Sequence, residues 1–368
     1  MRIRFWQNNI SPHHAEVYNA LAAMPEVSVS LVVQGEISPE RIRLGWREPE
    51  LRDVQIVRNW DESAADGLLD DPHTVEIFIA PWGYRKIRSA FRRAVPRSQV
   101  PLAMISEPGD WRGLSGAIRV ARGRLHSMLY GRRLAFVLAI GDLAEEWFLK
   151  CGYPSHKIFP YIYTTRPPSE VPALYTTGGR RLIFVGQLVQ RKGLDRLLIA
   201  LADFRDNDWE LMIVGNGPGR PYFQWLTSRL GLGNRVHFSG GVSNEDISAR
   251  IGKSDLLVLP SRWDGWGAVV NEALHEGVPV LVGERCGAKR LVQRELSGAV
   301  FREAESPKLK EALGEIFSRP PLSSTERAEI SERAKAISGT TVAEYLVQVV
   351  RFSVEGKGTR PSAPWDCM

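Results

Sequence analysis

Short apolar runs alternate with longer helix-like stretches along almost the whole chain of 368 residues. Consecutive parallel strands need a crossover connection, usually a helix, and strands buried on both faces read as short apolar runs. The alternation therefore predicts an α/β protein whose parallel sheets carry helices on both faces. In the N-terminal half the expected strands are Ile3–Gln7, Val29–Gln34, Val54–Arg58, Val75–Ala80, Leu102–Ser106 and Phe136–Ile140, and the expected helices include Ala15–Met24, Arg85–Val95 and Leu143–Cys151.

The alternation is interrupted once, at residues 166–180, where three prolines and two glycines predict a linker. The chain length also favours two domains, so we expect doubly wound, Rossmann-like domains at 1–165 and 181–340 that face a cleft. A helix at 341–355 is expected to cross back to the first domain, and residues 356–368 to form a flexible tail. The expected strands of the second domain are Leu182–Val185, Trp209–Val214, Val236–Ser239, Leu256–Leu259 and Val278–Val282, and its expected helices are Leu194–Phe204, Pro221–Leu230, Ala268–Glu276 and Glu326–Ile337.

Composition argues for a cytoplasmic protein. The longest apolar run, Leu134–Ile140, is far shorter than the roughly 20 residues of a membrane span, and the first residues offer no signal-peptide core. The three cysteines are far apart and odd in number, which predicts neither a disulfide framework nor a metal site: Cys151, Cys286 and Cys367.

Basic residues are concentrated between Arg85 and Arg133, where twelve Lys and Arg stand against only Glu107 and Asp110. This basic block favours a surface for anionic lipid headgroups or phosphates, which would place the protein peripherally at the inner membrane face. A set of solvated helix faces remains the alternative. No helix-turn-helix, zinc-finger or RNP signature accompanies the block, so nucleic acid is not expected as a partner.

Four loops of the C-terminal half follow strand ends, where open parallel sheets bind their ligands. The first runs from Gly186 and Gln187 to Arg191 and Lys192, just before a helix. A lysine beside a helix N-terminus can bind a phosphate, although an exposed loop cation would show the same pattern.

The second and third loops are glycine-rich. Gly215 and Gly217 begin a dinucleotide-like fingerprint, but Arg220 occupies its third glycine position, which argues against an NAD-dependent oxidoreductase. Either a close approach to a nucleotide or a plain turn explains these glycines. The third loop, at Gly241 and Val242, indicates a sharp turn or a close approach of the backbone.

The fourth loop carries Asp264, Trp266, Gly267 and Ala268 before a helix that contains Glu272. Free amides at the helix start can bind an anion, and the Glu272 carboxylate can accept two hydrogen bonds from a ribose diol. A solvent-facing glutamate is the alternative.

Together the four loops resemble the C-terminal domain of retaining family 4 glycosyltransferases of the GT-B fold. The family pattern is Glu, seven residues, then Glu, and this chain has D-G-W-G-A-V-V-N-E from Asp264 to Glu272. The resemblance covers about residues 182–301. It implies that Glu272 binds the ribose, Asp264 faces the donor sugar and Lys192 holds the donor diphosphate. It also implies that the amides of Trp266, Gly267 and Ala268 assist Lys192.

Two departures from the family pattern concern the charges around the donor. Asp264 replaces the first glutamate and shortens its reach by one methylene, and Gln187 stands where the family often has an arginine. Arg191 is a candidate replacement for that missing charge.

In the N-terminal half, the loop after the first expected strand contains Asn9, His13 and His14, and Glu107 follows a later strand. These are candidates for binding the acceptor or a sugar, with His14 as a catalytic candidate beside Lys192, Asp264 and Glu272. A helix start capped by Ser11 is the alternative explanation of the histidine loop. No convincing D-x-D motif follows a strand, so no metal is expected.

These observations predict a metal-independent, retaining glycosyltransferase that needs no cofactor. Its donor would be a UDP- or GDP-linked sugar, and its acceptor a glycan that is carried on a lipid or part of a cell-surface polysaccharide. A non-catalytic scaffold that binds sugar or lipid remains the principal alternative.

Overall fold

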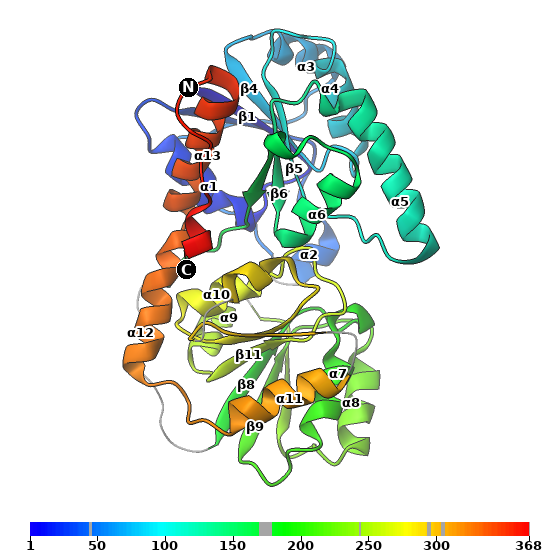
Figure 1. The fold of residues 1–368 in the computed structure, drawn as a ribbon, viewed down its shortest axis with the longest axis vertical. Helices are drawn as coiled ribbons and strands as arrows, with labels where there is room; N and C mark the ends of the chain where they lie inside the picture. The colour runs from blue at the N-terminus through cyan, green and yellow to red at the C-terminus, as the bar shows by residue number, and fades with distance from the viewer. Residues whose placement is uncertain (44–45, 169–178, 243, 293–295, 303–305, 368) are drawn as a thin grey trace. The chain divides into compact units, whose positions relative to one another are not determined.

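The computed structural model describes residues 1–368 except 44–45, 169–178, 243, 293–295, 303–305 and 368 (Figure 1). The chain divides into two compact units. Unit 1 comprises Met1–Ser38, Arg47–Thr165 and Ile337–Asp366, and unit 2 comprises Pro39–Trp46, Arg166–Ala336 and Cys367–Met368. The greater part of the expected linker, 169–178, lies outside the described residues.

Unit 1 is built on a seven-stranded parallel sheet in the order β3-β2-β1-β4-β5-β6-β7, with helices on both faces (Figure 1). Its strands are β1 Arg2–Gln7, β2 Ser28–Val33, β3 Gln55–Val57, β4 Thr74–Ile79, β5 Leu102–Ser106, β6 Phe136–Ile140 and β7 Ile158–Tyr161. Its helices are α1 Pro12–Ala22, α3 Glu62–Leu69, α4 Arg85–Ala94, α5 Gly113–His126, the π-helix η1 Ser127–Gly131, α6 Asp142–Lys150, α13 Gly339–Glu355 and the short η2 Ser155–Lys157 and η6 Pro364–Cys367.

Unit 2 has a six-stranded parallel sheet in the order β10-β9-β8-β11-β12-β13. Its strands are β8 Arg180–Val185, β9 Trp209–Val214, β10 Val236–Gly240, β11 Leu256–Leu259, β12 Val280–Gly283 and β13 Gly298–Phe301. Its helices are α2 Pro39–Arg43, α7 Leu194–Leu201, α8 Arg220–Arg229, α9 Asn244–Gly252, α10 Val269–His275, α11 Ser306–Phe317 and α12 Ser324–Arg333, with short turns η3 Gln190–Lys192, η4 Gly287–Val292 and η5 Ala334–Ile337.

The strand order determines where a ligand site can form. In unit 2 the chain runs outward from β8 to β10, then returns to place β11 on the other side of β8. Doubly wound sheets bind ligands at this reversal, beyond the carboxyl ends of the strands. The loops that follow β8 and β11 are therefore the expected ligand loops, and both belong to the four predicted from the sequence.

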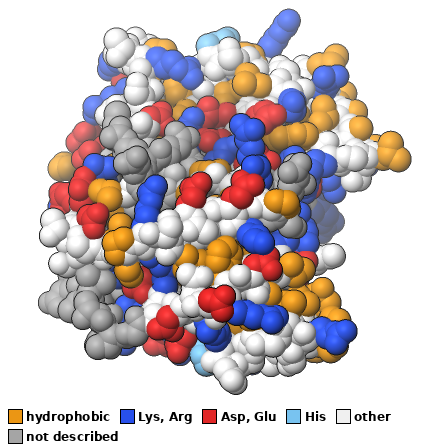
Figure 2. Space-filling model, turned by 60° about the horizontal axis from the view of Figure 1, so that its bottom comes forward, with side chains coloured by type: hydrophobic (Ala, Val, Ile, Leu, Met, Phe, Trp, Pro, Cys, Tyr) orange, Lys and Arg blue, Asp and Glu red, His pale blue; other side chains and the backbone are white. Residues whose placement is uncertain are grey.

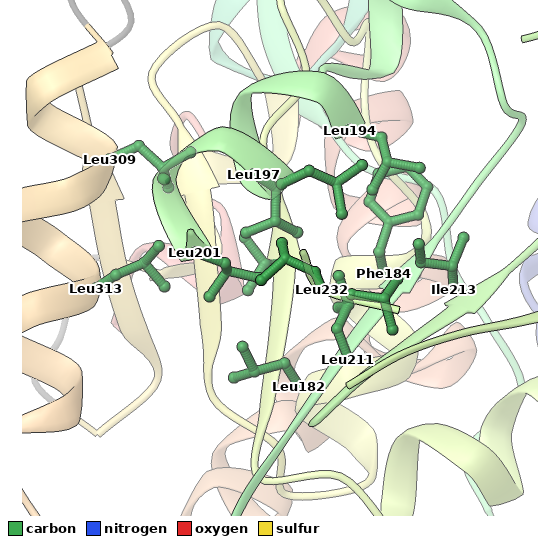
Figure 3. Packing of buried hydrophobic residues seen from close by; sticks show 14 of the residues in the cluster. Leu182, Phe184, Leu194, Leu197, Leu201, Leu211, Ile213, Leu232, Leu309 and Leu313 are labelled. Atoms are coloured by element: carbon green, nitrogen blue, oxygen red, sulfur yellow. The ribbon is translucent and has the colours of Figure 1, made fainter. Parts of the chain in front are cut away.

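The core of unit 2 lies between its sheet and helices α7, α8 and α11 (Figure 3). Leucines repeat along one face of α7, at positions 194, 197, 198 and 201, and meet Phe184 of β8. A helix with such an apolar stripe is stabilised chiefly by burying it.

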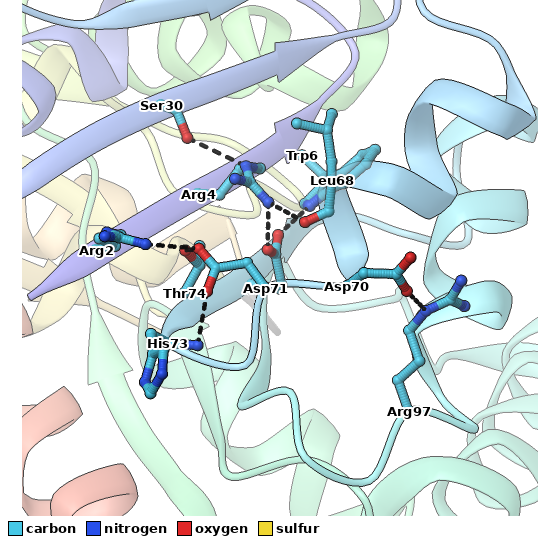
Figure 4. A network of polar contacts seen from close by, with 11 residues as sticks. Arg2, Arg4, Trp6, Ser30, Leu68, Asp70, Asp71, His73, Thr74 and Arg97 are labelled. Carbon is cyan, nitrogen blue, oxygen red and sulfur yellow. Dashed lines mark hydrogen bonds and ion pairs between the residues drawn. The ribbon is translucent and has the colours of Figure 1, made fainter.

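Unit 1 carries a polar network beside its central strands (Figure 4). Arg4 donates to the Leu68 carbonyl at 2.6 Å and to Glu76 at 2.7 Å, and the Trp6 indole donates to the other Glu76 oxygen at 2.5 Å. Burial of Glu76 raises the pKa of its carboxyl to about 7, against the opposing pull of Arg4. This network satisfies a buried carboxylate that would otherwise be costly.

The C-terminal segment differs from the flexible tail that its glycines and prolines suggested. Arg360 donates to the carbonyls of His156 and Ile158, both at 2.6 Å, and its guanidinium lies 4.2 Å from the centre of the Phe159 ring. Trp365 is buried against Tyr345 of α13. One aromatic anchor and one arginine hold the segment, and neither produces a periodic pattern in the sequence.

On the face drawn in Figure 2, basic and acidic side chains are interspersed, with hydrophobic side chains scattered between them. Among the described residues, no helix is both long and apolar enough to cross a bilayer.

Candidate active site

Lys192 and Asp264 meet at the reversal point of the unit 2 sheet. Lys192 ends η3 after β8, Asp264 follows β11, and the Lys192 ammonium lies 2.5 Å from the Asp264 carboxylate. Both side chains are largely buried. A buried cation and carboxylate placed this way form a pair that a bound anion can reorganise.

Further groups surround the Asp264 carboxylate. Ser261 donates to it at 3.3 Å, and the Arg191 guanidinium lies 3.8 Å away while donating to the Trp263 carbonyl at 2.8 Å. Two cations thus face one carboxylate, which leaves net positive charge beside the strand ends. Arg191, the candidate replacement for the charge absent at Gln187, thus lies beside this carboxylate.

Gly193 explains how the two loops come so close. Its φ is +72°, and a Cβ built there would lie 1.9 Å from the Pro260 carbonyl oxygen. Only glycine combines this left-handed conformation with so close an approach. The backbone after β8 therefore lies directly against the backbone after β11.

The glycine loop after β9 packs against the β8 loop in the same manner. A Cβ on Gly215 would lie 2.0 Å from the Gly186 oxygen, and one on Gly217 would lie 2.6 Å from the Leu188 oxygen. The Gly215 amide also donates to Gly240 at 2.8 Å, just before Gly241 and Val242. The structure thus brings three of the predicted loops together by backbone contact.

Glu272 lies in the first turn of α10, half-buried. Burial, with a smaller contribution from Glu276, raises the pKa of its carboxyl to about 8. Within the described part of the chain no donor satisfies this carboxyl. Its partial burial favours the protonated form, and hydrogen bonds donated by a ligand would favour the ionised form.

The backbone between Asp264 and Glu272 is held by its surroundings. The buried Trp266 indole donates to Asn271 at 2.8 Å, and the Cys286 thiol and the Ala288 amide donate to the Trp266 carbonyl at 2.7 and 2.9 Å. The Trp266 side chain is therefore a packing group, and Asn271 and Cys286 are supporting residues that the sequence analysis missed. The amides of Gly267 and Ala268 lie at the start of α10, where a helix leaves its N–H groups unpaired.

Three of the four candidates of unit 1 lie beside Tyr163, which follows β7 and was also missed. Tyr163 donates to Glu107 at 2.7 Å, and its ring lies 5.4 Å from His13 and 5.1 Å from His14. Asn9 is buried nearby in sequence, in the loop after β1. An aromatic residue two positions after the strand Ile158–Tyr161 is the signal that could have identified Tyr163.

His14 is enclosed by aromatic rings. Burial, and secondarily His13, lowers the pKa of its imidazole to about 3, so His14 is neutral near pH 7. Its buried Nδ1 has no hydrogen-bond partner among the described residues. His14 therefore cannot supply a positive charge, although it can accept or donate as a neutral group.

No group of three or more His, Cys, Asp or Glu side chains suited to a metal ion occurs within the described ranges.

The family described as Glycosyl transferases group 1 matches residues 173–337, which span the four loops of unit 2. This match covers somewhat less than half of the chain. The chain has the GT-B fold. Its fold resembles that of Anabaena HepE in complex with UDP, with a TM-score of 0.70 and 17% identity over 95% of this chain and 99% of that one.

Two curated relatives match part of the chain in sequence. The chain is 27% identical over 205 residues to an alpha-D-kanosaminyltransferase of Streptomyces kanamyceticus, covering 52% of this chain and 53% of that protein. It is 29% identical over 195 residues to a GDP-mannose-dependent phosphatidylinositol monomannoside mannosyltransferase of Mycobacterium tuberculosis, covering 50% of each. The chain thus matches about half the length of these relatives.

Proposed function

We propose that this protein is a retaining, family 4 glycosyltransferase that moves a sugar from a nucleoside diphosphate sugar to an acceptor hydroxyl. The observation that supports it is the Lys192–Asp264 pair at the reversal point of the unit 2 sheet. Cations there can stabilise the diphosphate as it leaves, which is the charge that develops in such a transfer.

In the proposed reaction the bond between the anomeric carbon and the diphosphate oxygen breaks, and the acceptor oxygen bonds to the same face of the sugar. The acceptor proton leaves with the departing diphosphate. Lys192, with Arg191 beside it, holds the diphosphate, and the amides of Gly267 and Ala268 assist. Asp264, displaced from Lys192 by the diphosphate, becomes available to the sugar hydroxyls. No metal is needed, since the protein supplies the cations.

The nucleoside would lie across the glycine loops. Gly186, Gly215, Gly217, Gly241 and Val242 would leave room for it. The Glu272 carboxylate would bind the ribose hydroxyls. A UDP- or GDP-linked donor fits this arrangement, and the relatives described above include a GDP-mannose-dependent enzyme and a UDP complex.

For the acceptor we propose a glycan carried on a lipid. The support is the mycobacterial relative, which is named for a phosphatidylinositol monomannoside. Asn9, His13 and Glu107 would contact the acceptor or the transferred sugar, with His14 as a neutral hydrogen-bonding group. A cytoplasmic location is consistent with Cys151 and Cys286, which are buried free thiols.

Replacing Lys192 tests the proposal. Lys192→Ala removes the buried cation, so turnover of the donor should fall by about 10²–10³-fold, the range for a lost transition-state donor. Lys310→Ala is the matched control, because Lys310 pairs with Asp203 at 2.8 Å in the same unit but on its exposed surface. Turnover is measured as release of nucleoside diphosphate from UDP- and GDP-sugars.

Unchanged turnover in Lys192→Ala would refute the role of Lys192. A wild-type protein that binds nucleotide but turns over none of these donors would instead support the non-catalytic scaffold.

A further inference from the structure

Helix α5 and the π-helix η1 form one helical stretch along the outside of unit 1, residues 113–131 (Figure 1). The inner face of this stretch packs closely on its neighbours at two glycines. A Cβ on Gly116 would lie 2.0 Å from the Trp111 carbonyl carbon, and one on Gly123 would lie 2.3 Å from the Cys151 sulfur. The helix therefore packs closely on unit 1 through the side that carries these two glycines. The face opposite the two glycines is therefore fixed outward.

That outer face is apolar. Leu114, Ile118, Leu125 and Leu129 follow one another at helical spacings of four, seven and four residues, with Met128 beside them. Their exposed fractions are 89%, 56%, 53%, 58% and 80%. We call these five residues the α5 ridge. They are five of the twelve exposed large hydrophobic side chains of the described chain, and such clustering marks an interaction site.

Cations flank the α5 ridge. Residues 113–131 contain no acidic residue, and Arg119 and Arg122 lie on one side of the ridge with Arg124 on the other. Helix α4 adds Arg88 and Arg92, which act on His126 together with Arg122 and so lie near it. The stacking of His126 on Trp82, with ring centres 3.8 Å apart, fixes this side of the helix.

Only part of the basic block contributes to this surface. Arg93 pairs with Glu62 and Asp66, Arg97 pairs with Asp66 and Asp70, and Arg133 donates to main-chain carbonyls. In contrast, Arg88, Arg92 and Arg122 form no ion pair within the described residues. The block is therefore divided between arginines that hold the fold together and arginines that face outward beside the α5 ridge.

We propose that α5 and η1 are a docking surface for an anionic lipid bilayer. The α5 ridge would enter the boundary between headgroups and acyl chains, and Arg88, Arg92 and Arg122 would meet the lipid phosphates. An apolar helix face with basic flanks is the pattern of helices that lie in this interface. Charge favours the bilayer over a second copy of the chain, because two such faces would bring their arginines together.

The experiment is co-sedimentation of the full chain with vesicles of equal parts phosphatidylcholine and phosphatidylglycerol, compared with phosphatidylcholine alone. The wild type should bind only the anionic vesicles at low salt. The triple variant Ile118→Ser, Leu125→Ser, Met128→Ser should partition at least about tenfold less. In the variant Arg88→Gln, Arg92→Gln, Arg122→Gln, partition onto the anionic vesicles should fall by about fivefold for each arginine removed. The binding that remains should depend much less on salt.

The matched control is the double variant Ile199→Ser, Trp225→Ser. It removes two hydrophobic side chains of unit 2 that are 50% and 59% exposed, and it should bind vesicles as the wild type does. Circular dichroism checks that each variant is folded, which is expected because every replaced side chain is exposed except that of Arg88, which is partly exposed.

Absence of wild-type binding to anionic vesicles at low salt would overturn the proposal. So would equal binding by the ridge variant, or a wild-type dimer in sedimentation that the ridge variant converts to a monomer. The assay uses no sugar donor, so its result is independent of the proposed transferase activity.

Discussion

At the scale of single residues, the centre of the candidate site is a contact between Lys192 and Asp264, which lie 72 positions apart in the sequence. In the sequence, each of them looks like any other charged residue of a loop. The two side chains meet because β8 and β11 are neighbours in the sheet, which places the loops that follow them side by side. The sequence predicted both residues as ligands of the donor, but only the fold shows that they neutralise each other when no ligand is bound.

Glu272 leads to a prediction about protons. Its pKa of about 8 lies above the ordinary 4.5, so near pH 7 the free protein holds this carboxyl protonated. Ribose hydroxyls that donate to the carboxylate favour the ionised form. Nucleotide binding at pH 7 should therefore release close to one proton, and the affinity should rise with pH up to about 8 and then level off.

Titration calorimetry in buffers of different ionisation enthalpy measures this proton. Glu272→Gln should release none, should bind with little pH dependence, and should bind nucleotide more weakly than the wild type at high pH by roughly 1.5–3 kcal/mol. Glu311→Gln, at an exposed pair with Lys308, is the control. Equal proton release by the wild type and Glu272→Gln would show that the ribose does not bind there.

At the scale of elements, the strands made mainly of apolar residues were predictable. Leu102–Ser106, Phe136–Ile140, Trp209–Val214 and Leu256–Leu259 have the expected bounds. Burial on both faces of a parallel sheet makes such strands recognisable without their neighbours. In contrast, β7 was missed because its four residues include Pro160, which is unusual within a strand.

Helix α5 was missed for a different reason. Its buried side is made of Gly116 and Gly123, while its leucines are exposed, so the ordinary relation between apolar pattern and burial is inverted. Glycine also lowers helix propensity. Pattern reasoning assumes that the apolar stripe of a helix faces the core, and it fails where that stripe faces outward.

The loop after β8 gives a prediction with a close control. Gly193→Ala places a Cβ 1.9 Å from the Pro260 carbonyl oxygen, so the loops of β8 and β11 must separate. Gly231→Ala has nearly the same φ, +69° against +72°, but its Cβ would meet nothing within 4 Å. The difference between the variants isolates the loop contact from the cost of the left-handed conformation.

Urea unfolding should show a loss of about 1 kcal/mol for Gly231→Ala and at least about twice that for Gly193→Ala. Nucleotide affinity should fall only in Gly193→Ala, because Lys192 is displaced from Asp264. Equal behaviour of the two variants would mean that the loops adjust without disturbing the site.

At the scale of the whole molecule, unit 1 is completed by the end of the chain. Helix α13 packs on α1, and a Cβ on Gly339 would lie 2.6 Å from the Glu16 backbone. Arg351 pairs with Glu26 at 3.1 Å, and the buried Trp365 follows. The chain thus passes through most of unit 1, then through unit 2, and returns to unit 1, where α13 covers α1.

This connectivity predicts that truncation at the C-terminal end affects unit 1 more than unit 2. Removing residues 338–368 exposes the apolar face of α1 and deletes the Arg360 hydrogen bonds beside β7, so the opening free energies of unit 1 should fall by several kcal/mol. The strands β8 and β11 of unit 2 should keep their protection. Hydrogen exchange measured by mass spectrometry reports both units in one experiment.

The full-length variant Gly339→Leu separates the effect of losing the contact between α13 and α1 from the effect of shortening the chain. It leaves every residue in place but forces α13 away from Glu16, so it should speed exchange in α1 and leave β8 and β11 unchanged. If the truncation loosens both units equally, the two units unfold as one cooperative body, and the return of the chain stabilises the whole molecule. If it loosens neither, α1 is held by the sheet alone, and the contact at Gly339 contributes nothing to stability.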